Sequence, residues 1–391
     1  MRARLTHKGI KEYMNTTSVP TPVRANPVVH LGFPRLRASG AAPADRPRVP
    51  DLIDRFGRVA RDLRVSLTDK CNLRCTYCMP AEGVQPVPGE RILTDAEVVR
   101  LVRIAVERLG VREVRFTGGE PLLRKGLEKI VAATSALSTD VGTRVETSLT
   151  TNALGLRHRA RRLKEAGLTR VNVSIDAADR ETYAALTRRD RFDDAVAGAR
   201  AAAEAGLLPV KVNAVLVRGV NDAQAVRLVA EALVSGYELR FIEQMPLGPS
   251  GKWTRSGMVA AEEILSRLEG AFKLVARPGT ERGSSPAELW DVAPGKVDGV
   301  EHPGGTVGVI ASITRPFCGD CDRTRLTADG QVRSCLFARE ETDLRSLLRA
   351  GADDDTIADA WRAAMWGKQP GHGVDDPSFL QPSRTMSAIG G

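Results

Sequence analysis

The chain has 391 residues, of which 42% are hydrophobic and 27% are charged, and its formal net charge at pH 7 is +9. This composition is typical of a globular protein, and no uncharged apolar run reaches the roughly 18 residues of a membrane-spanning helix. Residues 1–46 hold eight basic and two acidic residues and so supply six of the nine excess charges. The remaining charge and the 4% of aromatic residues are too little for a polyanion-binding surface, so we predict that the protein binds neither membranes nor nucleic acids.

The N-terminal region is rich in Pro, Arg and Ala and has no helical or strand periodicity. We therefore predict that residues 1–50 form a disordered basic extension without a catalytic role. An Arg bias is also typical of organellar transit peptides, but here Arg and Ala are abundant along the whole chain. With no recognisable secretory leader, we expect a cytoplasmic protein.

From residue 62 the chain alternates β-rich runs with amphipathic stretches, which indicates successive βα units and a parallel sheet. The first helical stretch begins with a capping box of Thr94 and Glu97 and ends at Gly110. The six candidate strands are residues 63–67, 113–117, 144–149, 170–175, 210–217 and 239–244. Six units are too few to close an eight-stranded barrel, so the pattern fits an open doubly wound sheet or a partial barrel.

Three cysteines follow the first strand: Cys71, Cys75 and Cys78 form a CxxxCxxC run. A structural zinc site normally has four protein ligands, whereas a 4Fe-4S cluster held by three cysteines leaves one iron free to bind another molecule. The spacing alone also permits zinc or disulfides. We favour the open cluster, which implies chemistry rather than a purely structural role.

The other three cysteines, Cys318, Cys321 and Cys335, form a CxxC followed by a more distant third cysteine. Disulfides in an oxidising compartment or a zinc site completed by His302 also fit this spacing. A chain of this length can bury a core without disulfides, and a reduced compartment fits better. We therefore favour a second 4Fe-4S cluster with an open iron.

Glycine and polar side chains follow the candidate strands repeatedly. Residues 118–121 read Gly-Gly-Glu-Pro after the second strand, residues 150–152 read Thr-Thr-Asn after the third, and Asp176 follows the fourth. Ligands of parallel α/β sheets bind at the carboxyl ends of the strands. The sequence thus predicts one site that combines these loops with the first cysteine run.

The CxxxCxxC spacing, with Tyr77 just before its last cysteine, resembles the cluster motif of the radical S-adenosylmethionine (SAM) enzymes. In that superfamily the amino acid part of SAM binds the open iron, and reduction of the cluster cleaves SAM to a deoxyadenosyl radical. The resemblance implies that the loop with Gly119 and Glu120 lies along the methionine part of SAM. The residues that it assigns to SAM are Tyr77, Gly119, Ser174 and Met245.

Residues from about 52 to 340 are similar to a narrower family, the GTP 3′,8-cyclases of molybdenum cofactor biosynthesis. The matching runs are residues 62–66, 115–121, 149–152, 171–176, 211–213, 240–243 and 317–321, followed by Arg323, Arg325 and the final Gly390-Gly391. The resemblance implies an incomplete (β/α)6 TIM-type barrel with a C-terminal cluster-binding α+β extension. We expect residues 51–280 to form the barrel and residues 281–391 the second domain.

In that family the second cluster binds the guanine of GTP, basic residues bind its triphosphate and ribose, and the Gly-Gly tail reaches into the active site. The residues that the resemblance assigns to GTP are Arg64, Arg115, Thr150, Lys211, Arg323 and Arg325. A triphosphate needs several cations or oriented donors, and these residues stand at strand ends or directly after Cys321. The set with catalytic roles is Cys71, Cys75, Cys78, Arg323, Arg325, Gly390 and Gly391.

The implied reaction converts GTP to 3′,8-cyclo-7,8-dihydro-GTP, the first step of molybdopterin synthesis. The implied partners are a reductant protein, a second copy of the chain in a homodimer and the downstream cyclic pyranopterin monophosphate synthase. Two departures from the family pattern are Ala153 in place of a glycine and Asp322 in place of an asparagine. The alternatives are a radical SAM peptide-modifying maturase with an auxiliary cluster and a non-enzymatic metal-binding interaction protein.

Overall fold

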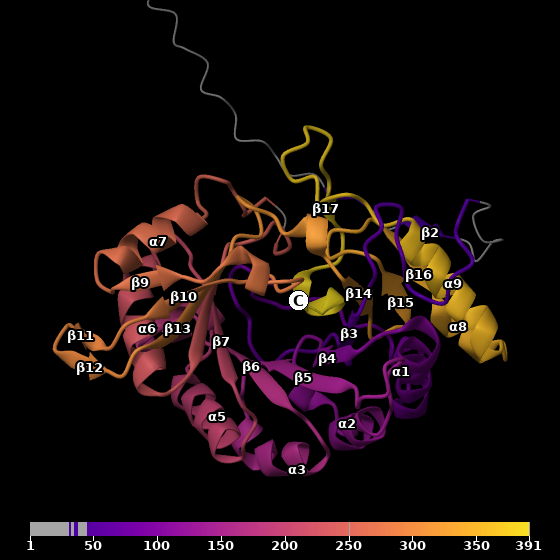
Figure 1. The fold of residues 1–391 in the computed structure, drawn as a ribbon, viewed down its shortest axis with the longest axis horizontal. Helices are drawn as coiled ribbons and strands as arrows, with labels where there is room; N and C mark the ends of the chain where they lie inside the picture. The colour runs from indigo at the N-terminus through magenta and orange to yellow at the C-terminus, as the bar shows by residue number, and fades with distance from the viewer. Residues whose placement is uncertain (1–30, 33–34, 38–44, 250, 391) are drawn as a thin grey trace, which may run out of the picture.

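The computed structural model describes residues 31–32, 35–37, 45–249 and 251–390, which form a curved sheet with helices on its outer face (Figure 1). Its centre is a run of parallel strands joined in chain order. These strands are β3 (Asp62–Ser66), β4 (Glu113–Thr117), β5 (Glu146–Thr151), β6 (Arg170–Ser174), β7 (Val210–Val215) and β8 (Glu238–Ile242). All six predicted strands are thus confirmed, and only their ends differ, by one or two residues.

Helices connect the central strands and cover the convex side of the sheet (Figure 1). They are α1 (Asp95–Leu109), α2 (Leu127–Ser135), α3 (Ala160–Glu165), α4 (Arg180–Thr187), α5 (Phe192–Glu204), α6 (Ala225–Val234) and α7 (Ala261–Glu269). Short 3-10 helices lie at Gly89–Arg91, Pro121–Leu123, Leu156–His158, Asp222–Gln224, Gly279–Glu281 and Cys318–Asp320. The predicted capping box is present, since Thr94 Oγ1 accepts from the Glu97 amide and the Glu97 carboxylate accepts from the Thr94 amide.

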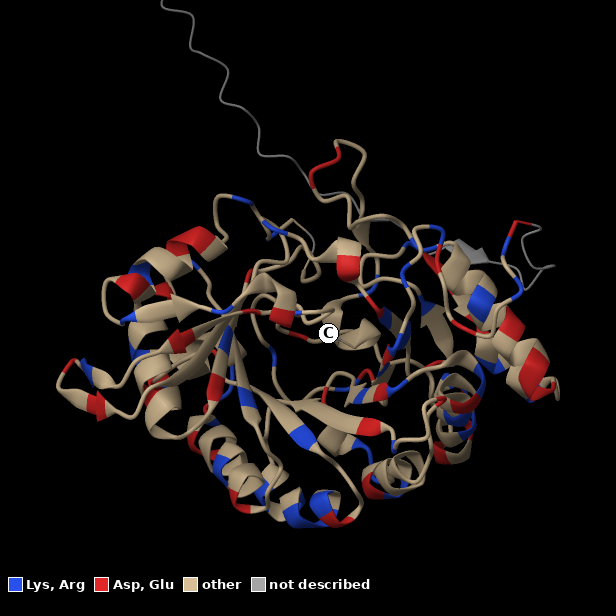
Figure 2. Ribbon diagram, viewed as in Figure 1, with Lys and Arg blue, Asp and Glu red and all other residues tan. Residues whose placement is uncertain are grey.

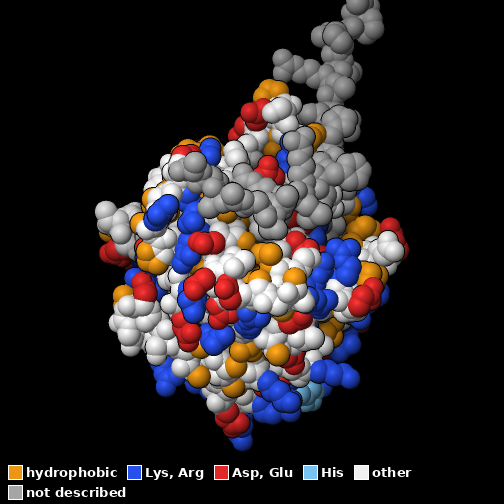
Figure 3. All heavy atoms as spheres, turned by 90° about the vertical axis from the view of Figure 1, so that its right-hand side faces the viewer, with side chains coloured by type: hydrophobic (Ala, Val, Ile, Leu, Met, Phe, Trp, Pro, Cys, Tyr) orange, Lys and Arg blue, Asp and Glu red, His pale blue; other side chains and the backbone are white. Residues whose placement is uncertain are grey.

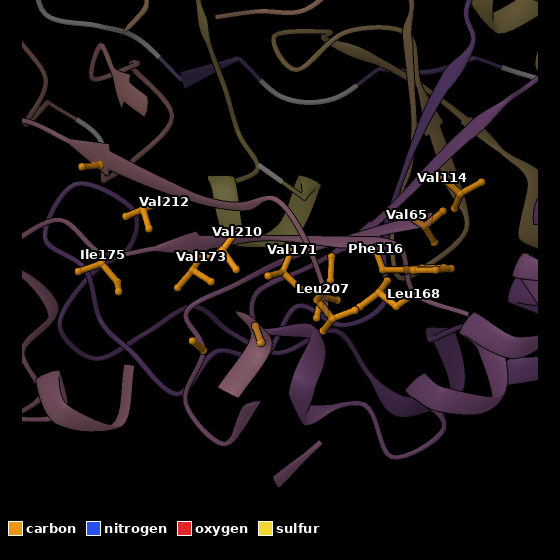
Figure 4. Close-up of a cluster of buried hydrophobic side chains, with 14 of the residues drawn as sticks. Val65, Val114, Phe116, Leu168, Val171, Val173, Ile175, Leu207, Val210 and Val212 are labelled. Atoms are coloured by element: carbon orange, nitrogen blue, oxygen red, sulfur yellow. The ribbon is translucent and has the colours of Figure 1, made fainter. Parts of the chain in front are cut away.

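The core lies between the sheet and the outer helices. The strands are rich in Val, Leu and Ile, and alternate residues of each point toward the helices (Figure 4). Helix α1 contributes a buried stripe that includes Val98, Leu101, Val102 and Ala105, at the spacing of one helical face. Burial of these side chains fixes the register of the strands, and therefore which polar residues face the other side of the sheet.

The C-terminal part of the chain extends both edges of the central sheet. On one side β13 (Gly305–Ile310) pairs in parallel with β8 and is followed by β10 (Glu288–Val292) and β9 (Leu274–Ala276). On the other side β14 (Arg323–Leu326) pairs in parallel with β3 and is followed by β15 (Gln331–Arg333) and β16 (Glu340–Asp343). The remaining elements are β11 (Gly295–Val297), β12 (Val300–His302), α8 (Leu344–Arg349), α9 (Asp354–Trp366), β17 (Gln381–Pro382) and α10 (Met386–Ile389).

This architecture is a partial TIM-type barrel, as predicted, with the C-terminal helix α10 at the centre of the arch (Figure 1). The sheet is continuous across the expected boundary between residues 280 and 281, so the division into two domains stays a prediction. Within the expected N-terminal extension, β1 (Leu31–Gly32) pairs with β17 and β2 (Arg35–Arg37) pairs with β16. Residues 45–50 are also described, and the rest of the extension lies outside the described residues.

Charged residues of both signs are interspersed along the outer helices, and charged residues also lie on strands of the sheet (Figure 2). The face that contains α8 and α9 carries the same mixture, without a continuous area of one sign among its coloured residues (Figure 3). In the described part of the chain, no helix combines the length and the apolar composition that crossing a bilayer requires.

Candidate active site

A cavity is enclosed by the inner face of the sheet, the loops after its strands and helix α10. Most of the predicted site residues line it. These are Arg64, Cys71, Cys75, Tyr77, Cys78, Arg115, Gly119, Thr150, Ser174, Met245, Arg323 and Arg325. The structure therefore brings together side chains that lie up to about 260 positions apart in the sequence, since β14 returns to the edge of β3.

The first three cysteines lie side by side in the loop after β3, each partly buried and unpaired. Backbone N–H groups of Leu73 and Ser387 donate to the sulfurs of Cys71 and Cys78. Burial raises the pKa of Cys78 to about 12, and that of Cys75 well above its ordinary value, because the nearby Asp176 and the other thiols also disfavour a thiolate. Such a site needs a bound cation or cluster to hold the thiolates that its sequence motif implies.

The three thiols of the cysteine loop are free and partly buried, and the nearby Asp176 is already hydrogen-bonded to Tyr77 and the Val215 amide. Three thiols suit a 4Fe-4S cluster, in which three irons bind cysteine and the fourth stays open, whereas a structural zinc ion requires a fourth protein ligand. The residues therefore fit a cluster, and its assignment to Cys71, Cys75 and Cys78 stays a prediction.

The Gly-Gly-Glu-Pro loop after β4 passes directly beneath the cysteine loop. A Cβ on Gly119 would lie 2.3 Å from the Lys70 carbonyl oxygen, and one on Gly118 would lie 2.5 Å from that of Thr68. The Glu120 carboxylate is fully buried and accepts hydrogen bonds from the Thr151 hydroxyl at 2.7 Å and the amides of Asn152 and Leu122 at 2.7 and 2.9 Å. The carboxylate therefore accepts from both loops, and Glu120 links the loop after β4 to the loop after β5. The Gly119 backbone lines the cavity.

Tyr77 joins the cysteine loop to the end of β6. Its hydroxyl donates to Asp176 at 2.7 Å, and Asp176 also accepts from the Val215 amide at 2.8 Å. Burial raises the pKa of Asp176 to about 6. The Tyr77 backbone approaches Gly248 so closely that a Cβ there would lie 2.0 Å from the Tyr77 carbonyl oxygen. Ser174 and Met245 line the same part of the cavity.

A row of arginines crosses the neighbouring strands β14, β3 and β4. Arg325 is in register with Arg64, and Arg64 with Arg115, so the three side chains leave the sheet at the same level. Asp62, in register with Arg323, lies 3.7 Å from both Arg64 and Arg323 and 3.9 Å from Arg115. Asp62 thus stands among four guanidinium groups, and Glu113 also pairs with Arg115 at 2.6 Å.

This arginine row has unused capacity for an anion. Burial and the nearby Arg115 place the pKa of Arg64 well below its ordinary value. The Nε atoms of Arg64 and Arg323 are buried without a hydrogen-bond partner, and both side chains line the cavity. Buried donors without partners are costly, and an anionic ligand would satisfy them. The residues therefore fit the predicted binding of a polyphosphate.

Thr150 and Lys211 extend this polar face along β5 to β7. Thr150 is in register with Asn172 and Asn172 with Lys211, so the three form a second row. Burial and the nearby Arg240 lower the pKa of Lys211 to about 8. Lys211 borders the cavity rather than lining it, whereas Arg240, which is in register with Asn213 of β7, lines it.

The second set of cysteines lies between the start of β14 and the end of β15. Burial raises the pKa of Cys318, although the His372 backbone N–H donates to its sulfur. Burial also tends to raise the pKa of Cys321, but the positive charges of Lys368 and Arg323 outweigh it, and the pKa lies below its ordinary value. The Phe337 amide donates to Cys335 at 3.4 Å. Three partly buried thiols with such donors fit a second cluster.

His302, the candidate fourth zinc ligand, has a structural environment of its own. It lies on β12, where its ring packs against Phe272 at 5.5 Å and its Nδ1 accepts from the Gly304 amide. The cavity lining beside Cys335 includes His372 and does not include His302. The zinc alternative thus loses its proposed fourth ligand.

The C-terminal tail reaches the arginine row. Arg325 donates to the Gly390 carbonyl, and a Cβ on Gly390 would lie 2.7 Å from Thr117 Cγ2. The left-handed conformation of Gly390, with φ of 70°, is one that glycine adopts without strain. These contacts place Gly390 beside the arginine row, whereas the role predicted for the tail stays a prediction and Gly391 lies outside the described residues.

Arg384 anchors the tail, and its role was not predicted. It forms ion pairs with Asp329 at 3.0 Å and with Glu341 at 2.8 Å. Asp62 and Lys368 were missed as well. The alternation of Asp62 with Arg64 on one face of a strand was a usable sequence signal for the first, whereas nothing in the sequence associates Lys368 with Cys321.

Of the two departures from the family pattern, Ala153 affects local geometry most. Its φ of 64° is the left-handed conformation that glycine favours, which explains the glycine expected there. Asp322 accepts the amides of Arg61 and Asp62 through its carbonyl and does not line the main cavity.

Comparison with known proteins identifies the family of the chain. Residues 65–232 match the radical SAM superfamily, and residues 237–374 match the family described as Molybdenum Cofactor Synthesis C. A GTP 3′,8-cyclase of Corynebacterium glutamicum is 60% identical over 350 residues, which cover 89% of this chain and 91% of that protein. The GTP 3′,8-cyclase of Mycolicibacterium smegmatis is 57% identical over 374 residues, covering 93% and 99% of the two chains.

The chain belongs to the GTP 3′,8-cyclase family. A third relative, from Streptomyces coelicolor, is 60% identical over 87% of this chain and 96% of its own length. Membership in this radical SAM family implies a 4Fe-4S cluster and SAM. The crystal structure of Streptococcus suis SuiB has a TM-score of 0.51 and 15% identity, covering 83% of this chain and 69% of that one, which shows a shared fold.

Proposed function

We propose that the protein is a radical SAM GTP 3′,8-cyclase that converts GTP to 3′,8-cyclo-7,8-dihydro-GTP, the first step of molybdenum cofactor biosynthesis. The observation that carries this proposal is the arginine row of β14, β3 and β4, which faces the same cavity as the first cysteine triplet. A radical cyclase must hold its nucleotide next to the source of the radical, and one cavity with both features meets that need. The peptide maturase and metal-binding alternatives are not favoured, because the relatives are GTP 3′,8-cyclases over nearly their whole length.

The first 4Fe-4S cluster would be held by Cys71, Cys75 and Cys78, and with SAM it would supply the carbon radical that starts the reaction. We assign SAM to the surface formed by Tyr77, Gly119, Ser174 and Met245. The backbone of Gly119 is accessible because the residue has no Cβ, and Ser174 offers a hydroxyl at the end of β6. The interaction of Tyr77 with Asp176 keeps the cysteine loop in place beside these residues.

We assign the triphosphate and ribose of GTP to Arg64, Arg115, Thr150, Lys211, Arg323 and Arg325. Several like charges in one buried row are stable only with anions among them, and the chain supplies two, Asp62 and Glu113. The triphosphate of GTP would supply the remaining negative charge that balances the arginines. Arg325 also donates to Gly390, so in this assignment the tail would lie next to the substrate. In this assignment the chain orients the nucleotide and excludes water, and thereby protects the radical.

A second 4Fe-4S cluster at Cys318, Cys321 and Cys335 would bind the guanine through its open iron. The support is chemical, since these three thiols, like the first three, are free and partly buried, and Cys318, Cys321 and Cys335 each accept a hydrogen bond at sulfur. Iron analysis tests this assignment: Cys335→Ser should bind half the iron of the wild-type protein and keep SAM cleavage. A full iron content in this variant would contradict the second cluster.

Further assignments follow from the family and remain proposals. They are a barrel domain at residues 51–280, a cluster domain at residues 281–391, a homodimer, a separate reductant protein, a cytoplasmic location and delivery of the product to cyclic pyranopterin monophosphate synthase. Size-exclusion chromatography with light scattering tests the dimer directly.

The decisive experiment measures 5′-deoxyadenosine and cyclised product from anaerobically reconstituted, dithionite-reduced protein with SAM and either GTP, ATP or no nucleotide. We expect GTP alone to give the cyclised product. Cys75→Ala should abolish SAM cleavage, whereas Arg323→Ala should retain cleavage and lose its dependence on GTP. Arg277→Ala is the matched control, because Arg277 pairs with Asp291 on the surface. Normal cyclisation by Cys75→Ala or Arg323→Ala would sink the proposal.

A further inference from the structure

Lys368 has a buried ammonium group next to the second set of cysteines. It follows helix α9, and the residue is 3% exposed. Its Nζ donates to the carbonyl oxygens of Cys321 at 2.9 Å and Arg323 at 3.0 Å, and to Cys321 Sγ at 3.4 Å. An ammonium group has three donors, so each proton has an acceptor. The side chain is therefore held in one position at the start of β14.

The charge of Lys368 lacks an obvious counter-ion. Among the described residues, its acceptors are two carbonyl groups and one sulfur, and no carboxylate forms an ion pair with it. A buried cation without a compensating anion is costly, whereas a paired one is tolerated. Of the three acceptors, only the sulfur of Cys321 can carry a negative charge, and it would do so as a thiolate bound to iron.

Four of the other five cluster cysteines accept a hydrogen bond from a neutral backbone donor. The sulfur of Cys71 accepts from the Leu73 amide, Cys78 from the Ser387 amide, Cys318 from the His372 amide and Cys335 from the Phe337 amide. A cationic hydrogen bond to sulfur is thus found at one of the two triplets, within the part of the chain that the structure describes. The sequence shows two sets of three cysteines but not how their environments differ. The contact with Lys368 distinguishes the second set from the first.

We propose that Lys368 is a positioning residue that serves as the counter-ion of the second 4Fe-4S cluster and raises its reduction potential. This inference rests on the second cluster of the proposed function. A cation near a thiolate ligand stabilises the reduced cluster, which carries one more negative charge than the oxidised cluster. The same ammonium binds the Arg323 carbonyl, so it also connects the cluster ligand to an arginine assigned to GTP.

The test uses a protein in which the second cluster is the only source of signal. In a Cys71→Ala/Cys75→Ala/Cys78→Ala background, iron content and the EPR spectrum of the dithionite-reduced protein report the second triplet alone. Lys368→Met removes the charge and keeps most of the side-chain volume, and Lys368→Arg keeps the charge. Lys296→Met is the control, because Lys296 is exposed on β11.

We expect Lys368→Met to shift the midpoint potential of the cluster to a more negative value and to lose iron to a chelator about tenfold faster. Lys368→Arg should restore much of the potential, and Lys296→Met should change neither quantity. The melting temperature adds a separate readout. Since the cation gains its counter-ion only with the cluster, Lys368→Met should reduce the stabilisation that iron loading gives, beyond any loss in the apo protein.

Two results would overturn the inference in different ways. If the triple-alanine background binds no iron, there is no second cluster, and the assignment under the proposed function fails together with this one. If the background binds its cluster but Lys368→Met has the same potential and iron retention as Lys368, the second cluster stands and the role of Lys368 is refuted. An equal fall in the stability of apo and loaded protein, with an unchanged potential, would show that Lys368 only packs α9 onto β14.

Discussion

Replacement of Arg384 by alanine should release the C-terminal tail from the active site. Arg384 is the main anchor of the tail, through contacts of 3.0 and 3.1 Å with Asp329 and two contacts of 2.8 Å with Glu341. The side chain of Asp329 is 2% exposed and that of Glu341 is fully buried. Arg384→Ala would therefore remove a positive charge that pairs with two buried carboxylates.

The expected cost is about 3 kcal/mol, near the lower end of what removing one partner of a buried ion pair costs. The lower end applies because each carboxylate keeps other partners: Thr327 and Arg91 contact Asp329, and Arg333 pairs with Glu341. If the free energy of local opening of the tail falls by about 3 kcal/mol, amide hydrogen exchange in the tail becomes roughly 100-fold faster. The amide of Met386, which donates to the Leu247 carbonyl at 3.0 Å, is the reporter.

Hydrogen–deuterium exchange of residues 381–390 and GTP turnover measure this prediction together. Arg384→Ala should lose protection at Met386 and reduce turnover, because the carbonyl of Gly390 is then no longer held on Arg325. Arg384→Lys keeps the charge but cannot bind a carboxylate through two nitrogens, so an intermediate effect is expected. Arg277→Ala, which removes an exposed pair with Asp291, is the control. Unchanged exchange and turnover in Arg384→Ala would refute the reasoning.

Two further predictions concern Lys211 and the pair Ala153 and Gly198. Burial and Arg240 lower the pKa of Lys211 to about 8, so its positive charge in the free enzyme is lost as the pH rises through 8. The KM for GTP should rise above pH 8 and stay flat in Lys211→Arg, and a flat wild-type KM between pH 7 and 9.5 would contradict the assignment. Ala153 has a φ of 64°, so Ala153→Gly should raise the free energy of unfolding by about 0.5–1 kcal/mol in urea titrations. A Cβ on Gly198 would lie 2.3 Å from the Ala153 carbonyl oxygen, so Gly198→Ala should lower the free energy of unfolding by about 2 kcal/mol, and an unchanged value would show that helix α5 can shift.

The local part of the fold was predictable because its signals are local. Strands β3 to β8 appear in the sequence as β-rich runs, and α1 begins and ends at residues that cap it, namely Thr94 and Gly110. Each of these features depends on residues a few positions apart. The cysteine triplet and the loop after β4 were placed correctly for the same reason, since both directly follow a strand.

The pairing of distant segments was not predictable from these signals. Neither the return of β14 to the edge of β3 nor the pairing of β13 with β8 depends on local spacing. Contacts such as that of Lys368 with Cys321 depend on this topology and on how α9 packs. Such contacts cannot be predicted from the spacing of residues in a single sequence. Motif resemblance could assign Arg323 and Arg325 to the binding of GTP. It could not show that the two arginines lie in register with Asp62 and Arg64.

That register has a consequence for how the two expected domains depend on each other. A chain ending near residue 280 would keep the first cysteine triplet, Arg64 and Arg115, but would lose β14, β13 and the tail. It would expose the backbone edges of β3 and β8, which are both paired in the full chain, and unpaired sheet edges favour aggregation. It would also remove two of the arginines that surround Asp62. The part of the chain beyond residue 280 thus forms part of the wall of the active site, so the expected domain boundary is not a boundary between separate functions.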